Sequence, residues 1–471
     1  MAQAEADGRV IAVRVFWLTV QSYMLQYNNI YDMLRNVIRG DSAATIAAAI
    51  EAALQSGKLA AGHRLPAIRD LAKTLKVRPV TVASAYRLLR DRGLAKGSGR
   101  RGTALRAHAR SVPATIDRAG SRGAQVDLVT GNPDPSFLPS LGPALRSIDP
   151  DTKLYGGPAD SSALVAFAAG EFAADGIAEG PIAITSGGLD AIERLLREHA
   201  RVGDHIAIED PTFPALLDLL ASLGLVPAPF AIDDEGPRPE ALERALGPRV
   251  PAVVISSRAQ NPTGAAITER RASDLRRLLH HRPRALLIEI DDAATIAGTS
   301  LATLTQGREH WAAVRSTSKW LGPDLRVAVT TGDAITIGRL QRRQTVNVRW
   351  VSHVLQNLTL ALWSDPSSGR LFARAADVYA ERRNAVIEAL AAHEIKAHGR
   401  SGFNVWIPVR EETTTVQALA DRGWAVAAGE RFRVQSPPAI RVTTSALPPA
   451  EATRFAVDLA ASFRQRGSVP A

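Results

Sequence analysis

The chain lacks cysteine altogether, and aromatic residues make up only 5% of its 471 positions. The absence of cysteine excludes disulfide bonds, thiolate zinc sites, iron–sulfur ligation and cysteine nucleophiles. A long apolar run is also absent, because the apolar stretch 10–24 is short and contains Arg14. We therefore expect no membrane span and no signal peptide there. Three readings stay open for residues 1–33: a disordered extension, a packing arm, or a start codon assigned too early, with Met33 as one candidate true start.

Composition and length predict a folded chain with more than one unit. Hydrophobic residues make up 46% and charged residues 22%, a balance typical of globular proteins. The formal charge is +10, but the segment 34–110 holds 16 Lys and Arg against 4 Asp and Glu, so the rest of the chain is nearly neutral. A small basic unit beside a large neutral one indicates an anionic partner, with nucleic acid as the first candidate.

The basic segment, 34–106, predicts three short helices and a hairpin. Ile46, Ile50 and Leu54 share helical spacing, and two further helices are expected over 68–75 and 79–92. Glycine and basic residues at 96–103 then favour a short hairpin. Three helices followed by a basic hairpin form a winged helix-turn-helix, in which the third helix enters the major groove and the wing contacts the backbone.

This pattern of turn, helices and glycines resembles the GntR family of bacterial regulators over about 60 residues. The resemblance implies the following DNA-contacting residues: Arg69 against phosphate, Arg78 and Thr81 at the start of the recognition helix, and Arg100 and Arg101 in the wing. Pro79 departs from the family, which often has a base-reading arginine there. Base recognition is therefore expected to depend on few side chains. A helical packing domain without DNA is the alternative.

A polar linker at 107–125 separates this unit from a large α/β unit, 126–471, whose smaller subdomain is expected from about 370 onward. Apolar runs predict strands of a mainly parallel sheet at 182–184, 205–208, 252–255, 285–290 and 327–329. Functional side chains of such sheets gather at the carboxyl ends of the strands.

The residues near these strand ends match the parts of a pyridoxal phosphate (PLP) site. Lys319 is expected to form a Schiff base with the cofactor, and Asp291, preferred over Asp292, to hold the pyridine nitrogen. Asn261 would donate to the ring oxygen and Phe213 would cover the ring. The expected phosphate group comprises Gly187, Gly188, Ser316, Ser318 and Arg326. Arg441 is the candidate for gripping the carboxylate of a substrate or effector.

The order of these residues resembles fold-type I aminotransferases over roughly 127–463, including 131–135 and 402–406. Joined to the basic unit, the chain resembles the MocR subfamily of GntR regulators. That resemblance implies a head-to-tail homodimer in the cytoplasm that binds repeated operator half-sites. It also implies a PLP-binding fold that senses a small amine or amino acid, with catalysis reduced or lost.

Several departures bear on activity: Ala293 replaces a common tyrosine, Leu189 and Asp190 replace a glutamine pair, Phe213 replaces tyrosine, and Asp160 replaces glycine. They argue against efficient transamination, yet an active aminotransferase with a DNA-binding unit stays the leading alternative. A sensor of PLP itself and a scaffold without cofactor are the others. The pair His280–His281 is read as a solvated helix end, so no metal site is expected.

Overall fold

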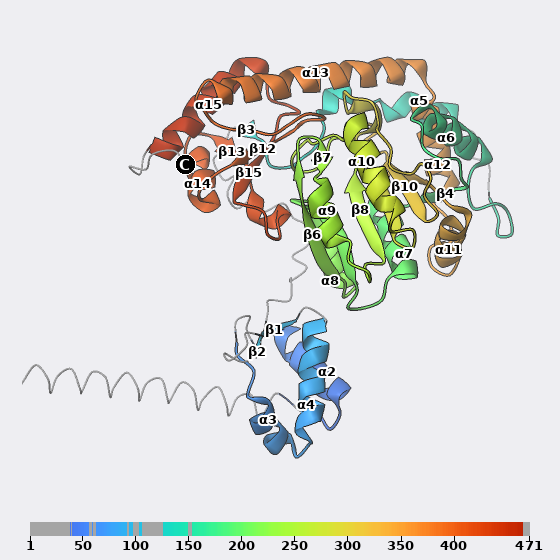
Figure 1. Ribbon diagram of the computed structural model, residues 1–471. Coiled ribbons are helices and arrows are strands. Elements are labelled where there is room, and N and C mark those ends of the chain that lie inside the picture. Colours follow the sequence, from blue (N-terminus) through green and yellow to red (C-terminus); the bar gives the residue numbers. More distant parts are fainter. Residues whose placement is uncertain are drawn as a thin grey trace, which may run out of the picture. The chain divides into compact units, whose positions relative to one another are not determined.

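The computed structural model divides the chain into two compact units, Met1–Val112 and Pro113–Ala471 (Figure 1). It describes residues 38, 40–55, 59, 63–91, 94–97, 103–105, 126–148 and 153–464. The expected extension 1–33, the linker 107–125 and the wing residues Arg100 and Arg101 lie outside the described residues.

The basic unit is a winged helix-turn-helix. Its elements are α2 (Ala43–Gln55), α3 (Ile68–Leu75), α4 (Pro79–Asp91), β1 (Ala95–Gly97) and β2 (Thr103–Leu105). The two strands pair antiparallel, with Ala95 opposite Leu105. Ile46 and Ile50 of α2 pack with Val82 and Leu89 of α4 in one buried cluster. The expected helices and hairpin are confirmed.

The turn between α3 and α4 is fixed by backbone and side-chain contacts. Lys76 ends α3 in the left-handed conformation (φ 55°), and the Val77 amide donates to the Ala72 carbonyl at 3.0 Å. The Tyr86 hydroxyl of α4 donates to the Pro66 carbonyl at 2.8 Å and is fully buried. These contacts hold α4 at a set angle to the segment that starts α3.

The large unit contains an eight-stranded sheet in the order β4–β11–β10–β9–β8–β5–β6–β7. The strands β6, β5, β8, β9 and β10 are parallel, and β11 runs antiparallel between β10 and β4. The strand bounds are β4 Ile182–Thr185, β5 His205–Asp210, β6 Val226–Asp233, β7 Gly236–Pro237, β8 Ala252–Ser256, β9 Leu286–Asp291, β10 Trp311–Ser316 and β11 Ala328–Gly332. All five expected strands are present.

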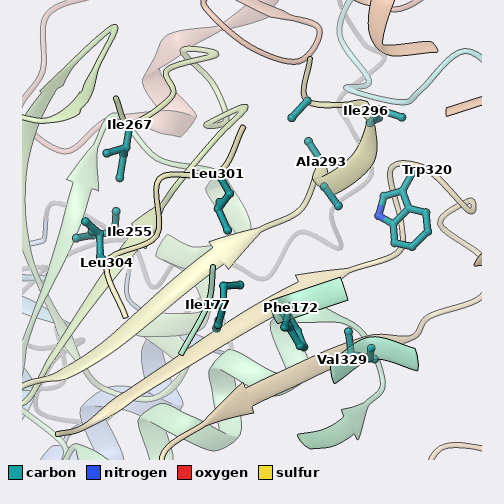
Figure 2. Close-up of a cluster of buried hydrophobic side chains, with 14 of the residues drawn as sticks. Phe172, Ile177, Ile255, Ile267, Ala293, Ile296, Leu301, Leu304, Trp320 and Val329 are labelled. Carbon is teal, nitrogen blue, oxygen red and sulfur yellow. The ribbon is translucent and has the colours of Figure 1, made fainter. Parts of the chain in front are cut away.

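Helices cover both faces of the sheet (Figure 1). One buried cluster joins the sheet to α7 (Gly188–His199), α8 (Pro214–Ser222) and α11 (Ala334–Thr345). The other joins it to α6 (Ser162–Ala174), α9 (Pro239–Ala245), α10 (Glu269–His280), α12 (His353–Trp363) and α13 (Pro366–Ala391). Figure 2 shows part of this second cluster, including Phe172, Ile255 and Trp320. Burial on both faces explains why the parallel strands are continuous apolar runs.

A smaller subdomain follows α13. Its three-stranded sheet has the order β12 (Asn404–Pro408), β15 (Ala439–Thr443), β14 (Ala427–Ala428). The strand β13 (Trp424–Ala425) pairs in parallel with β3 (Val126–Asp127), so the beginning of the large unit is tied to its carboxyl-terminal part. The helices α14 (Glu412–Ala420) and α15 (Pro449–Arg464) complete it. No helix of the described residues combines the length and apolarity that crossing a bilayer requires.

Candidate functional site

A cavity opens where the carboxyl ends of β5, β8 and β9 meet the smaller subdomain. It contains three of the expected residues, Phe213, Asn261 and Lys319. The rest of its lining is Ser256, Arg258, Ala259, Ile290, Asp292, Ala293, Gly402, Phe403 and Asn404. The parallel sheet therefore brings together side chains that are more than 100 positions apart in the sequence.

Lys319 lies at the centre of this site. Its ammonium group Nζ donates a hydrogen bond to the carbonyl of Gly131 at 2.7 Å. Burial lowers the pKa of the Lys319 ammonium, and nearby Asp292 opposes that shift. A lowered pKa makes the neutral, nucleophilic amine easier to reach at physiological pH.

The two neighbouring aspartates face opposite sides of the sheet, because successive strand residues alternate in direction. Asp291 accepts hydrogen bonds from Arg258 at 2.9 Å and from Arg315 at 3.0 Å. Burial would raise the pKa of Asp291, but the two guanidinium groups outweigh it and hold the pKa at about 2. Asp291 does not line the cavity, so the sequence-based preference for it over Asp292 does not match the geometry.

Asp292 faces the cavity instead. Burial raises the pKa of Asp292 to about 6, while Lys319 partly opposes the rise. One Asp292 carboxyl oxygen lies 3.6 Å from where a Cβ on Gly188 would stand. Asp292 is thus the carboxylate between Lys319 and the start of α7.

The expected phosphate residues also gather in one place. Gly187 has φ of 93°, and a Cβ there would approach Arg326 Nη2 to 2.9 Å, so this position requires glycine. A Cβ on Gly188, the first residue of α7, would lie 3.5 Å from the Cβ of Ser316. The Ser316 hydroxyl donates a hydrogen bond to the Ser318 hydroxyl, with 3.1 Å between the two oxygens. The result is a helix amino terminus flanked by hydroxyl groups and an exposed arginine, an arrangement suited to an anion.

Asp190 belongs to this region, although the sequence suggested no site role for it. One oxygen of its carboxylate accepts from the Ser186 amide at 3.0 Å, and the other accepts from Arg194 at 2.9 Å. A carboxylate therefore already occupies one amide beside the glycine turn.

Arg441 is a buried cation that does not line the cavity but contacts the cavity residue Asn261. It is 5% exposed, and burial lowers its pKa to about 10. Its guanidinium group donates to Asn261 Oδ1 at 3.1 Å and to the Val129 carbonyl, and it stacks 4.8 Å from the centre of the Phe432 ring. Among the described residues its Nε has no hydrogen-bond partner, and the charge of Asp127 only partly opposes the lowering of its pKa by burial. An unpaired buried guanidinium group is an expensive feature unless a ligand satisfies it.

A short strap, defined here as Val129–Asn132, lies against both cations through its carbonyl groups. Arg441 donates to Val129, Lys319 to Gly131, and the Ser445 hydroxyl to Asn132 at 2.6 Å. Gly131 adopts φ of 64°, and a Cβ there would meet Arg441 Nη1 at 3.2 Å. Sequence reasoning missed this role because backbone carbonyls leave no trace in residue type.

Asn404 is a second polar residue of the cavity that the sequence analysis did not single out. It is 7% exposed, and its Oδ1 accepts a hydrogen bond from Thr443 at 3.2 Å. The only available signal was its place in the segment 402–406, which carried part of the resemblance to aminotransferases.

The expected DNA-contacting residues that fall in the described part lie at the surface of the basic unit. Arg69 on α3 and Arg78 just before α4 are exposed, and Thr81 is half-buried on the first turn of α4. That first turn contains no acidic residue. An exposed helix start with a neighbouring arginine suits the phosphate backbone of DNA.

Comparison with known proteins identifies both units. Residues 42–105 match the family model for bacterial regulatory proteins of the gntR family, and residues 127–459 match aminotransferase class I and II. Two solved structures share the fold of the large unit, both below 25% identity. The Thermus thermophilus aspartate aminotransferase tetra mutant has a TM-score of 0.64 and 22% identity, covering 72% of this chain and 96% of that one. The Pyrococcus horikoshii kynurenine aminotransferase has a TM-score of 0.66 and 20% identity, covering 75% and 94%.

Full-length regulators are also similar to this chain. The vitamin B6 salvage pathway transcriptional repressor PtsJ of Salmonella typhimurium is 37% identical over 427 residues, which cover 90% of this chain and 99% of the repressor. The HTH-type transcriptional regulator YdcR of Escherichia coli is 26% identical over 76% of this chain and 84% of its own length. These relatives favour regulation over the alternative of a working aminotransferase. The chain belongs to the MocR subfamily of GntR regulators: it is a DNA-binding transcriptional regulator with an aminotransferase-like domain of fold type I.

Proposed function

We propose that this regulator binds PLP in the cavity around Lys319, and that PLP binding changes its affinity for operator DNA. The observation that carries the proposal is the pairing of Lys319 with Asp292 in one cavity, next to the glycine turn at Gly187 and Gly188. An amine of lowered pKa, a buried carboxylate and an anion-binding helix start are the three features that an aldehyde, a pyridine and a phosphate require together.

The residues present fit that molecule. Lys319 would bond its aldehyde carbon, Asp292 would pair with the pyridine nitrogen, and Asn261 and Phe213 would contact the ring. The phosphate would take the amides after Ser186 with Ser316, Ser318 and Arg326. PLP supplies, when bound, a carbonyl group that condenses reversibly with amines. Ala293 offers no hydroxyl group to the ring oxygen, and Asp190 places negative charge at the phosphate end, so we propose reversible rather than permanent binding.

Arg441 would bind the carboxylate of a second ligand. Its Nε lacks a partner, and its two terminal nitrogens are held only by neutral oxygens of Asn261 and Val129. A carboxylate that replaced the Val129 carbonyl would form a charge-assisted pair in a buried place. We propose an amino acid or a similar small amine as the second ligand of this site.

The strap gives these ligands a route toward the DNA-binding unit. Lys319 must release the Gly131 carbonyl before its amine can react, and a carboxylate on Arg441 displaces the Val129 carbonyl. Both events would release a carbonyl group of the strap, while the contact of Ser445 with Asn132 remains. The strap directly follows β3, and β3 directly follows the segment 107–125 that leads from the basic unit. Ligand binding would therefore act on residues that lie close to β3 in the chain, and we propose that this couples the site to the DNA-binding unit.

The similarity to PtsJ suggests which genes this regulator controls. PtsJ is named as a repressor of vitamin B6 salvage, and its likeness extends over 90% of this chain. We propose that this chain likewise governs genes of vitamin B6 supply, with PLP as the metabolite that it reads. Operator DNA lies in the bacterial nucleoid, so the protein would act in the cytoplasm.

A head-to-tail homodimer is part of the proposal. Leu154 and Tyr155 are each 78% exposed and Val346 is 81% exposed, although all are large and apolar. Arg349 stacks 5.0 Å from the Tyr155 ring, and Trp350 meets that ring edge-on, so the loops 153–157 and 346–350 lie side by side. An exposed apolar cluster of this kind suits a subunit interface. Two copies would present two basic units to repeated half-sites.

The visible absorbance spectrum of the purified protein with added PLP tests the binding site. A band above 400 nm that borohydride bleaches, with the reduced label mapped to Lys319, is the expected result. A label on another lysine, or no band, would contradict the site. Steady transamination of amino acids at rates typical of enzymes, about 10 per second, would instead support the enzyme alternative.

A further inference from the structure

The recognition helix α4 carries a surface stripe, defined here as Val80, Ala83, Ser84 and Arg87, in which Val80 and Arg87 are exposed and Ala83 and Ser84 are half-buried. These positions share helical spacing and face away from the core. The opposite face is buried: Val82, Ala85, Tyr86 and Leu89. The amino-terminal half of the stripe is apolar and small, so it lacks the arginine, asparagine or glutamine side chains that usually pair with base edges.

Val80 is the outstanding member of this stripe, with 65% of its surface exposed. Among the described residues of the basic unit, Val77 before the helix and Val82 within it contact the buried cluster, while Val80 does not. Its neighbour Pro79 occupies the first position of α4 and donates no backbone hydrogen bond. Val80 therefore projects from the first turn of α4 on the side opposite the buried residues.

We propose that Val80 recognises the 5-methyl group of a thymine in the major groove. Among the major-groove edges of the bases, the thymine methyl is the feature that an apolar side chain can contact favourably. Residues at the amino-terminal end of a recognition helix are the ones that reach base edges. Arg78 on one side and Arg87 on the other are exposed and can hold the phosphates that fix this position.

The inference rests on the insertion of α4 into the major groove and on no property of the PLP site. It predicts a preference for thymine at one base pair. That preference would come from the apolar contact of Val80 with the methyl group, and hydrogen bonds would contribute little there. Burying a group of methyl size changes affinity by roughly three- to fivefold, so the effect is modest and specific to one position of each half-site.

Deoxyuridine scanning tests this contact directly, because deoxyuridine differs from thymidine only by the missing methyl group. An operator is first selected from random DNA with the wild-type protein, and each thymine is then replaced singly by deoxyuridine. We expect one replacement in each half-site to weaken wild-type binding about fourfold. In Val80→Ala the same replacement should have no effect, and this variant should bind the deoxyuridine operator as tightly as the wild type does.

Ile68→Ala is the matched control, because Ile68 is also an exposed apolar residue of the basic unit, at 36%, but lies on α3. It should keep the full sensitivity to the missing methyl group. Val80→Thr keeps one methyl group and should retain part of it. Two results would overturn the proposal: no thymine whose replacement weakens wild-type binding, or a sensitivity that persists unchanged in Val80→Ala. Loss of dimerisation in Val80→Ala together with an insensitive wild type would assign Val80 to a protein contact instead.

Discussion

The two units of this regulator hold their functional cations in opposite environments. In the basic unit, Arg69 and Arg78 stand exposed on the surface. In the aminotransferase-like unit, Arg441 is 5% exposed, and Lys319 has its pKa lowered by burial. Exposed cations attract any phosphate backbone and are screened by salt, whereas buried cations bind few ligands but bind them selectively.

This difference determines which residues can respond to one specific ligand. We expect the exposed arginines of the basic unit to supply affinity that depends little on DNA sequence. Lys319 and Arg441 each donate to a strap carbonyl, and Arg441 also donates to Asn261, so a matching ligand would replace neutral partners of both cations. We therefore expect substitutions in the cavity to have large and specific effects, and substitutions of surface arginines to have small and general ones.

Lys319→Ala should have the largest effect. Without the amine, the absorbance band with PLP and the borohydride label should both disappear, while folding and basal DNA binding persist. Absorbance titration and DNA-binding assays measure the two outcomes. Lys396→Ala, which alters an exposed lysine of the same unit, should leave the band intact. Loss of folding in Lys319→Ala would show that the lysine is structural.

Arg441→Lys should come next. Lysine keeps the charge but cannot form the two parallel hydrogen bonds of a guanidinium–carboxylate pair. We expect the response of operator binding to an amino acid effector to weaken by about thirtyfold in ligand concentration, corresponding to roughly 2 kcal/mol. PLP binding should be retained. An unchanged effector response would remove Arg441 from the ligand site, and Arg374→Lys on the exposed side of α13 is the control.

Asp291→Asn and Asp292→Asn form a matched pair that separates structure from ligand binding. Asp291→Asn removes the carboxylate that Arg258 and Arg315 share, so we expect a loss of about 3–5 kcal/mol in the free energy of unfolding. Asp292→Asn should weaken PLP binding without lowering the free energy of unfolding, because it removes a buried charge whose raised pKa makes the ionised form unfavourable. Chemical denaturation and absorbance titration of both variants decide the matter. The reversed pattern would restore Asp291 as the cofactor carboxylate.

The pH dependence of stability follows from the same pair. The pKa of Asp291 is about 2 in the fold, below its ordinary 3.8, so its stabilising contribution is complete above about pH 4 and is lost as the pH falls toward 2. The pKa of Asp292 is raised to about 6, so its contribution becomes less favourable as the pH rises from about 4 to 6. In Asp291→Asn, the free energy of unfolding should no longer fall as the pH drops from 4 to 2. In Asp292→Asn, that fall should remain.

Arg69→Ala should have the smallest effect. It should weaken binding to operator and unrelated DNA by similar factors and reduce the slope of log affinity against log salt by about 1. Fluorescence titrations at several salt concentrations measure that slope. Arg146→Ala, an exposed arginine of the other unit, is the control. An unchanged slope in Arg69→Ala would reject a phosphate contact.

The sequence predicted the fold well because its signals are local. Apolar runs marked the five expected strands, and the spacing of Ile46 and Ile50 marked the buried side of α2. Residue types alone also pointed to Lys319, Asn261 and Phe213, which do share the cavity.

Two features of the site could not be predicted from the sequence: the direction in which each aspartate side chain points, and the contacts made by backbone carbonyl groups. Asp291 and Asp292 are identical and adjacent, so only the strand register decides that one faces Arg315 and the other faces Lys319. The strap acts through carbonyl groups that every residue possesses. The exposed position of Val80 became visible only when the opposite face of α4 was seen to be buried.

We propose that a ligand of the aminotransferase-like unit sets the affinity of the basic unit for DNA. It is tested most directly by measuring operator affinity with and without PLP, in the wild type and in Lys319→Ala. We predict that PLP changes wild-type affinity by at least tenfold and leaves Lys319→Ala unchanged. Equal wild-type affinity with and without PLP, in a protein that carries the label on Lys319, would contradict the claim and leave the bound PLP without a regulatory role.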